Sequence, residues 1–411
     1  MPRRGAFFYA LLVFLAGASL IREAALGRLA RVEEAWTAWV ARVASPTFPP
    51  SRVTLVEINE DTMGKHDWPW APDDFAVFFH AVLPFEPAVI ALGEILDFDR
   101  SILVERDPVY ERMLKDHVLR TPKLVLAGRL AWSQDPDVAP DLKPMPVLRK
   151  VTGDMGRVPE FSDVGSWAAE EYRVTTQPGW TNLPDDLGTR GRCPLILRYR
   201  GQPVPGIVLQ LAMHVERVTL DEVEVVLGSH VTLGNRRTIP IDDAGRMAVN
   251  FGASFARVSF DDLLLSREQL DRKETPVQGP ELFKDRVVIL ARTDPDSSTL
   301  TAPGNRPVSP AEVFAAGLAT LGAERQPARV GGWFDWLLVA VASLSALWLR
   351  KWKPLLSSII IITLVACYVG AALWVFRSRL ITVPGLLMAG LAVWLLLLRS
   401  VARRIEKVIA F

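Results

Sequence analysis

The chain has 411 residues, of which 50% are hydrophobic and 23% are charged. This hydrophobic content is higher than a soluble protein of this size usually shows, so we predict a membrane protein. The net charge of +1 gives no strong field, which argues against nucleic-acid binding.

Four hydrophobic segments flank a charged, proline-containing middle region. A helix that crosses a bilayer needs about 20 mostly apolar residues, so we predict four transmembrane helices. The first is short, and Ala16-Gly17-Ala18-Ser19 leaves a cleaved signal peptide as the alternative. The segments are Ala6 to Ile21, Trp333 to Leu349, Leu355 to Phe376 and Leu380 to Leu398.

Basic residues at the ends of these segments predict their orientation. Four crossings put all three basic groups on one side, which the positive-inside rule makes the cytoplasm. Arg377 and Arg379 are a weak exception on the other face. The groups are Arg3 with Arg4, then Arg350, Lys351 and Lys353, and finally Arg399, Arg403, Arg404 and Lys407.

The predicted product is a multi-pass protein of the cytoplasmic (inner) membrane with both termini in the cytoplasm. We divide it into an anchor (1–22), a stalk helix (23–46), an extracytoplasmic domain (47–330), three membrane helices (333–398) and a basic cytoplasmic tail (399–411). The tail leaves no room for an output domain, so we expect a separate partner. Cys193 and Cys367 fall in different regions, so we expect no disulfide between them.

The stalk carries apolar residues in a 4-3-4-3-4 spacing, which predicts a helix with one apolar seam. One interpretation is a helix packed on its own domain. The other is a dimerising stalk that continues from the first membrane helix. Thr47 to Pro50 would end it, because proline blocks helix continuation. The seam is Ala25, Leu29, Val32, Trp36, Trp39 and Val43.

The middle region begins with a strand at Arg52 to Ile58, a helix at Asp73 to Leu83 capped by Asp73, and a strand at Ala88 to Leu92. Short apolar strands separated by a helix predict a parallel sheet. A helix at Val109 to Val118 and a strand at Lys123 to Ala127 follow, and residues 135–186 are expected to form loops and short elements.

The second half of the region mixes hairpins with helices, which predicts an α/β domain with a mixed, partly parallel sheet. Ser309 is expected to cap the last helix, with Pro310 in its first position. Strands are expected at Cys193 to Tyr199, Glu222 to Leu227, His230 to Leu233, Arg236 to Ile241, Met247 to Phe251 and Arg286 to Ala291; helices at Val208 to Val218, Ser259 to Leu265 (capped by Ser259) and Ser309 to Gly322.

Acidic and aromatic residues follow the first two strands. Ligands of open parallel sheets bind beyond the carboxyl ends of the strands, so a polar or cation-binding cleft is one interpretation. The other is ordinary strand-end caps, with the tryptophans as a plug in the core rather than a ligand platform. The candidate ligand-binding residues are Glu57, Asn59, Glu60, Asp61, Trp68, Trp70, Glu94, Asp97 and Asp99.

Catalytic and metal-binding motifs are not recognisable in the sequence. The histidines lack a metal-ligand spacing, and no nucleophile elbow or phosphate-binding loop occurs. We therefore predict no metal, no cofactor and no catalytic residue. Asp335 is an ionisable group near the end of a membrane segment, where we expect it to face the interface.

The order of these motifs resembles the type-2 CHASE domain, an extracytoplasmic sensory module of bacterial signalling proteins that is followed by three membrane helices. The resemblance covers Leu26 to the C-terminus. It rests on Val56 to Thr62, the WPW motif Trp68-Pro69-Trp70, Ile90 to Phe98, Gly188 to Arg192, Leu195 to Arg198, Val249 to Gly252, Val258 to Leu263, Val287 to Leu290 and Pro310 to Leu321.

Three positions depart from the family pattern. Ala71-Pro72-Asp73 stands where an arginine usually follows WPW, Asn59 replaces an aspartate, and Ala291 followed by Arg292 replaces the glycine that closes the late strand. Family members commonly carry a cyclase, a diguanylate cyclase or a kinase in the same chain, and none fits after Leu398.

The resemblance implies a sensor or ligand-binding protein that signals through a partner. The alternatives are a structural or assembly component of an envelope complex and an envelope enzyme that uses the acidic cluster. Small residues in the membrane segments favour close helix packing and a homodimer; they are Gly370, Ala371, Gly385, Ala389 and Gly390.

Overall fold

The computed structural model describes residues 3–26, 28–44, 51–66, 68–98, 108–121, 123–132, 145–185, 187, 191–297, 299–303, 306–323, 328–349, 352, 354–379, 381–385 and 387–397. The chain forms two compact units. Residues 48–326 form the α/β unit, and residues 1–47 with 327–411 form the helical unit.

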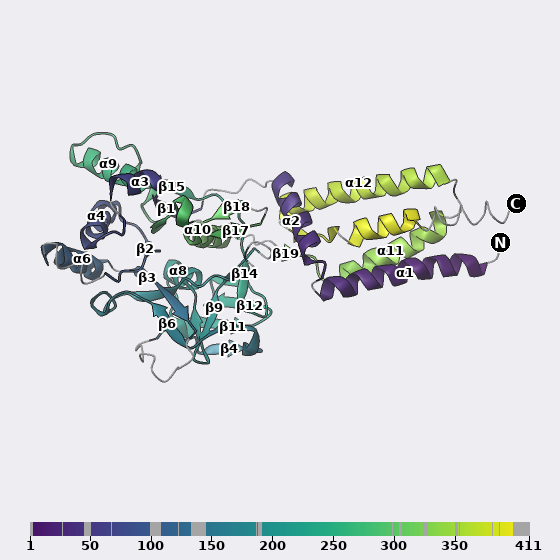
Figure 1. The fold of residues 1–411 in the computed structure, drawn as a ribbon, viewed down its shortest axis with the longest axis horizontal. Coiled ribbons are helices and arrows are strands. Elements are labelled where there is room, and N and C mark those ends of the chain that lie inside the picture. The colour runs from purple at the N-terminus through teal and green to yellow at the C-terminus, as the bar shows by residue number, and fades with distance from the viewer. Residues whose placement is uncertain are drawn as a thin grey trace. The chain divides into compact units, whose positions relative to one another are not determined.

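A seven-stranded sheet organises the α/β unit (Figure 1). Its order is β15-β1-β16-β2-β3, and β3 pairs with both β6 and β7. All pairs are parallel except β3 with β6, which confirms the predicted mixed, partly parallel sheet. The strands are β1 (Val53–Ile58), β2 (Val89–Leu92), β3 (Leu124–Ala131), β6 (Asp163–Ser166), β7 (Gln177–Trp180), β15 (Ala256–Ser259) and β16 (Val287–Arg292).

Helices cover both faces of this sheet, because its central strands are apolar on both sides. On one face Val56 and Val288 pack with α4 (Pro72–Val82), α6 (Pro108–Arg120) and α9 (Phe260–Asp271). On the other face Leu55 and Ile289 pack with α8 (Ile207–Glu216) and α10 (Pro310–Gly322). The unit is therefore a three-layer α/β/α arrangement.

Smaller sheets complete the α/β unit. The pairings are β10-β9-β5, β13-β12-β11-β4, β14-β8 and β17-β18. Their bounds are β4 (Lys150–Thr152), β5 (Glu160–Phe161), β8 (Arg192–Pro194), β9 (Ile196–Tyr199), β10 (Gln202–Pro205), β11 (Val223–Val226), β12 (His230–Leu233), β13 (Arg237–Pro240), β14 (Arg246–Ala248), β17 (Leu300–Ala302) and β18 (Arg306–Val308); a short helix, α3, spans Glu60–Lys65.

Capping residues in the sequence predicted some helix ends correctly and others incorrectly. Ser309 caps α10 through a hydrogen bond from the Glu312 N–H, as predicted. Ser259 caps α9, but that helix continues to Asp271. The prediction that Asp73 caps α4 is wrong, because Pro72 already begins the helix and its neighbour Asp74 accepts a hydrogen bond from the Ala71 N–H at 2.9 Å.

The single strand predicted at Cys193 to Tyr199 is two strands that serve different sheets. β8 pairs with β14, and β9 pairs with β10 and β5. The chain changes sheets at Leu195, whose N–H donates to the Gly245 carbonyl at 3.0 Å. A continuous apolar run in the sequence therefore contains two strands that belong to different sheets.

The helical unit contains α1 (Arg3–Ala25), α2 (Ala30–Ala44), α11 (Trp333–Leu349), α12 (Pro354–Arg379), a helix at Leu387–Leu397, and the short parallel pair β19 (Ala328–Arg329) and β20 (Ile381–Thr382). Among the residues searched, one helix, Leu355–Arg379, is long and apolar enough to cross a membrane by length and composition. Trp333–Trp348 and Leu387–Leu397 are apolar but shorter. The structure thus supports one of the four predicted spans on this criterion.

α2 is a helix separate from α1. α1 ends at Ala25 and α2 begins at Ala30, so no continuous helix leads out of the first hydrophobic segment. α2 belongs to the helical unit and packs against α12. The predicted end of the stalk at residues 47–50 lies outside the described residues.

Candidate functional site

The carboxyl ends of β1, β16 and β2 meet at one edge of the main sheet. Ile58 is in register with Arg292, and Leu290 with Leu92. Residues that follow these strands therefore share one rim. Gly93 allows the turn after β2, because a Cβ there would lie 2.7 Å from the Ala291 Cβ.

An arginine–aspartate pair occupies the centre of this rim. The Arg292 guanidinium donates two hydrogen bonds of 2.8 Å to the two carboxylate oxygens of Asp294. Its other partner is the Trp68 ring, whose centroid lies 4.7 Å from Arg292 Cζ. Trp68 therefore covers the cation, which fits the cation–π preference for tryptophan.

Burial and pairing compete at Asp294, whose exposure is only 4%. Burial raises the pKa of this carboxyl, but the Arg292 hydrogen bonds and charge outweigh it and hold the pKa below its ordinary value. The same hydrogen bonds raise the pKa of Arg292. The pair is thus ionised at neutral pH and joins β16 to the WPW loop.

Glu94 lies beside this pair. Its carboxylate accepts a hydrogen bond from the backbone N–H of Arg292 at 3.0 Å. Burial is the largest influence and raises the pKa of Glu94 above its ordinary value, although the Arg292 hydrogen bond and charge oppose the shift. A half-buried carboxyl with a raised pKa is suited to taking up a proton or a polar ligand group.

Asn59 has a structural role at the start of α3. Its side chain accepts a hydrogen bond from the Thr62 N–H at 2.9 Å, and the Thr62 hydroxyl donates to Asp261 at 3.1 Å. Lys65 donates to the same Asp261 oxygen at 3.2 Å. Asn59, which replaces the family's aspartate, is therefore also a suitable N-cap residue.

Glu57 lies on the side of the sheet that α10 covers. It forms an ion pair of 2.6 Å with Arg257, which forms a second one of 2.6 Å with Glu312. The structure thus separates Glu57 from the rim that holds Glu94.

Trp70 is a core residue, as the plug interpretation predicted. It is 3% exposed, and its ring centroid lies 4.6 Å from that of Phe260 and 5.5 Å from that of Phe75. Trp68 is half-buried. The two tryptophans of the motif therefore have different roles, one inside the core and one on the rim.

The remaining candidates do not join the cluster. Glu60, Asp61 and Asp97 are exposed, and Asp99 lies outside the described residues. Within the described part of the chain, no group of three or more His, Cys, Asp or Glu side chains could hold a metal ion. The rim thus offers Trp68, Glu94, Arg292 and Asp294, of which the first two are among the predicted ligand-binding residues. The sequence signal beside Arg292 was the family's glycine, which Ala291 replaces immediately before it.

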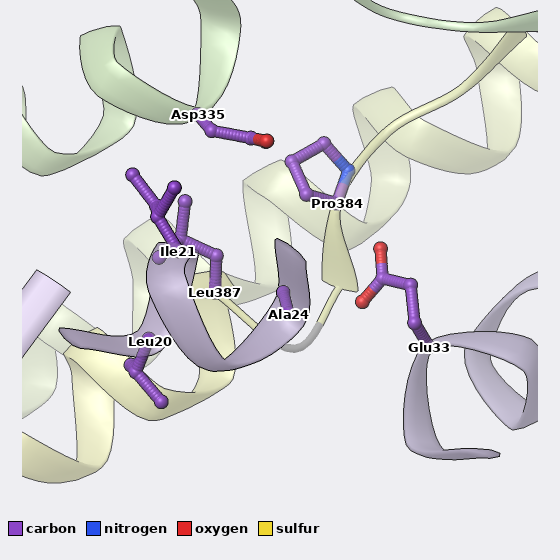
Figure 2. Close-up of a pocket in the computed structure, with 7 residues that line it drawn as sticks. All are labelled: Leu20, Ile21, Ala24, Glu33, Asp335, Pro384 and Leu387. Carbon is purple, nitrogen blue, oxygen red and sulfur yellow. The ribbon is translucent and has the colours of Figure 1, made fainter. Parts of the chain in front are cut away.

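The helical unit holds a small cavity (Figure 2). Figure 2 shows the carboxylates of Glu33 and Asp335 on either side of Pro384, with Leu20, Ile21 and Ala24 of α1 below Asp335. The cavity measures about 20 Å³, which is room for about one water molecule. A ligand of metabolite size does not fit there.

Comparison with known proteins places the chain in a family. The sequence matches the CHASE2 domain over residues 8–349. No curated protein and no solved structure was found to match it. The match spans the α/β unit together with α11 and most of α1, and the resemblance drawn from the ordered motifs is confirmed. The chain belongs to the CHASE2 family, whose members are extracytoplasmic sensory domains.

Proposed function

We propose that this protein is a membrane-anchored extracytoplasmic sensor, in which the α/β unit receives the input and α2 carries it to the membrane helices. Family membership supports the sensory role, and the long apolar helix Leu355–Arg379 supports the membrane anchor. The proposal includes four spans, both termini in the cytoplasm, and a partner that reads the state of the helices.

The observation that carries this proposal is a clamp between α2 and the turn after α12. The Trp36 indole N–H donates to the Val383 carbonyl at 2.9 Å. The Gly385 N–H donates to the Glu33 carboxylate at 3.2 Å. The Trp36 ring also lies directly on Gly385, where a Cβ would overlap it.

The position of α2 in the chain allows this clamp to transmit a displacement of the α/β unit. α2 is the last helix before the α/β unit, so a displacement of that unit pulls first on α2. Because Trp36 and Glu33 hold the turn between α12 and the helix at Leu387–Leu397, the displacement reaches those two helices without a further element.

The rim of the main sheet is the proposed site of input. Glu94 has a raised pKa beside an Arg–Asp pair that Trp68 covers. A polar ligand or a proton that engages Glu94 would act on β16 through the Arg292 N–H. In chain order, β16 is followed by β17, β18, α10 and β19 before α11 begins.

The clamp is tested by a distance measurement in bilayers. Nitroxide labels on Val43→Cys in α2 and Leu364→Cys in α12, in a Cys367→Ala background, report their separation by pulsed electron resonance; Cys193 is buried. Gly385→Val should broaden or shift the distance distribution because its side chain displaces Trp36.

Gly370→Val is the matched control, because a Cβ there meets nothing within 4 Å. It should leave the distribution of the parent unchanged. If Gly385→Val also leaves the distribution unchanged, α2 is not held by this clamp and the proposed route is wrong.

A further inference from the structure

α2 has a broad apolar side, and the helical unit covers only part of it. Val40 and Ala44 are 2% and 7% exposed. Val32, Trp39 and Val43 are 52%, 40% and 52% exposed. At 100° per residue these three side chains lie within about 40° of one another around the helix, so they form one outer stripe.

The outer stripe lies at an end of the bundle that is rich in exposed tryptophan. α2 crosses this end of the bundle (Figure 1), where Glu33 shares the cavity with Asp335. Trp333 and Trp336 begin α11 there and are 67% and 48% exposed.

The opposite end of α11 carries a second aromatic group. Trp348 is 52% exposed and Trp352 is 39% exposed, and their ring centroids are 5.0 Å apart. Tryptophan at both ends of an apolar helix marks the two interfaces of a bilayer. The outer stripe of α2 therefore lies at the level of one of these interfaces.

We infer that α2 is an interfacial helix whose outer stripe of Val32, Trp39 and Val43 inserts into the headgroup–acyl boundary of the outer leaflet. The inference rests on the membrane anchor of the proposed function and adds the lipid surface as a binding partner of α2. A 15-residue helix with apolar side chains on one exposed face suits this position.

Lipid fits this stripe better than a second copy of the chain does. Three partly exposed side chains offer on the order of 250 Å², whereas a specific interface needs about 800 Å² on each partner. The exposed surfaces of α11 and α12 continue the apolar surface on the same unit; Leu337 and Leu364, for example, are 45% and 49% exposed. A bilayer covers all of these surfaces at once.

The consequence is a helix with two attachments. Its inner side is clamped to the turn after α12, and its outer side rests on the bilayer. A pull from the α/β unit must lift the stripe from the lipid, so the stripe opposes movement of α2.

Spin-label accessibility in the full chain, reconstituted in phosphatidylcholine–phosphatidylglycerol vesicles, tests the inference. Single labels on Val32→Cys and Val43→Cys, in the Cys367→Ala background, are exposed to oxygen, which concentrates in lipid, and to a water-soluble nickel chelate. Leu364→Cys in α12 is the lipid reference. Val226→Cys on β11, which is 38% exposed, is the water reference.

Labels on the stripe are expected to show at least threefold lower nickel accessibility than Val226→Cys, with oxygen accessibility between the two references. Nickel accessibility equal to that of Val226→Cys, while Leu364→Cys reports lipid, overturns the inference and leaves the proposed anchor intact. Low accessibility to both reagents with spin–spin broadening also overturns it, because a second copy then covers the stripe. If Leu364→Cys itself reports water, the membrane anchor fails and the inference fails with it.

Discussion

Replacing Trp70 separates a core role from a ligand role for the WPW motif. Trp70 is 3% exposed and packs against Phe75 and Phe260. Truncating such a residue to alanine removes its packing and leaves a cavity, which costs about 3–5 kcal/mol. Trp68→Ala is the matched control, because a half-buried ring over Arg292 contributes about 0.5–1 kcal/mol.

Cys193 provides the assay. It is 1% exposed in the core of the α/β unit, and burial raises the pKa of its thiol to about 12. Alkylation of the full chain in a Cys367→Ala background therefore reports opening of that unit. A loss of about 3–5 kcal/mol speeds alkylation by about a hundredfold to a few thousandfold.

The two variants should therefore differ widely. Trp68→Ala should speed alkylation by only about two- to fivefold. If Trp70→Ala stays within about threefold of the parent, the ring is not part of the core and the packing argument is wrong.

Three further predictions concern charged groups of the α/β unit. Asp294→Asn should lower the free energy of unfolding at neutral pH by about 3 kcal/mol, because it leaves Arg292 without its carboxylate. Since the pKa of Asp294 is lowered in the folded state, the parent should lose this contribution as pH falls through that pKa. A variant whose stability falls with acid as the parent's does would contradict the pairing. Glu94 has a raised pKa in the folded state, so its contribution to the free energy of unfolding is present at low pH and is lost as pH rises through that pKa. Glu94→Gln keeps the acceptor for the Arg292 N–H and should flatten the pH profile of the thermal midpoint. An unchanged profile would argue against a buried carboxyl. Arg257→Ala leaves Glu57 facing Glu312 and should lower the thermal midpoint by about 2 °C, with a smaller loss for Arg257→Lys; no change at low salt would show that this network contributes nothing.

The sequence predicted the strands well because buried parallel strands are short apolar runs. β1, β2 and β16 each lie within about one residue of their predicted bounds. An apolar run does not show which strand it pairs with, so the change of sheet at Leu195 was not predicted. Partner choice depends on contacts between distant parts of the chain, and local composition does not encode them.

The candidate site was predicted in part for a related reason. Glu57 and Asn59 are two residues apart but have different partners, because Glu57 forms an ion pair with Arg257 and Asn59 caps α3. Arg292 ends a different strand, and only the register of β1 with β16 brings it near the WPW loop. The one departure from the family pattern beside it is Ala291, which stands immediately before Arg292 in place of a family glycine.

α2 illustrates the limit of periodicity. The spacing of Val32, Trp36, Trp39 and Val43 predicted a helix with apolar positions on one side, and such a helix exists. Spacing states which side chains share a face and leaves open what covers them. Trp36 covers Gly385 within the helical unit, whereas Trp39 stays exposed.

Thiol labelling in spheroplasts tests the proposed topology most directly. Val226→Cys places a reactive thiol on the α/β unit, and Trp352→Cys places one between α11 and α12, each in the Cys367→Ala background. A membrane-impermeant maleimide is expected to label Val226→Cys in intact spheroplasts and to label Trp352→Cys only after lysis. Labelling of Trp352→Cys in intact spheroplasts, with Val226→Cys protected until lysis, would contradict an extracytoplasmic sensor.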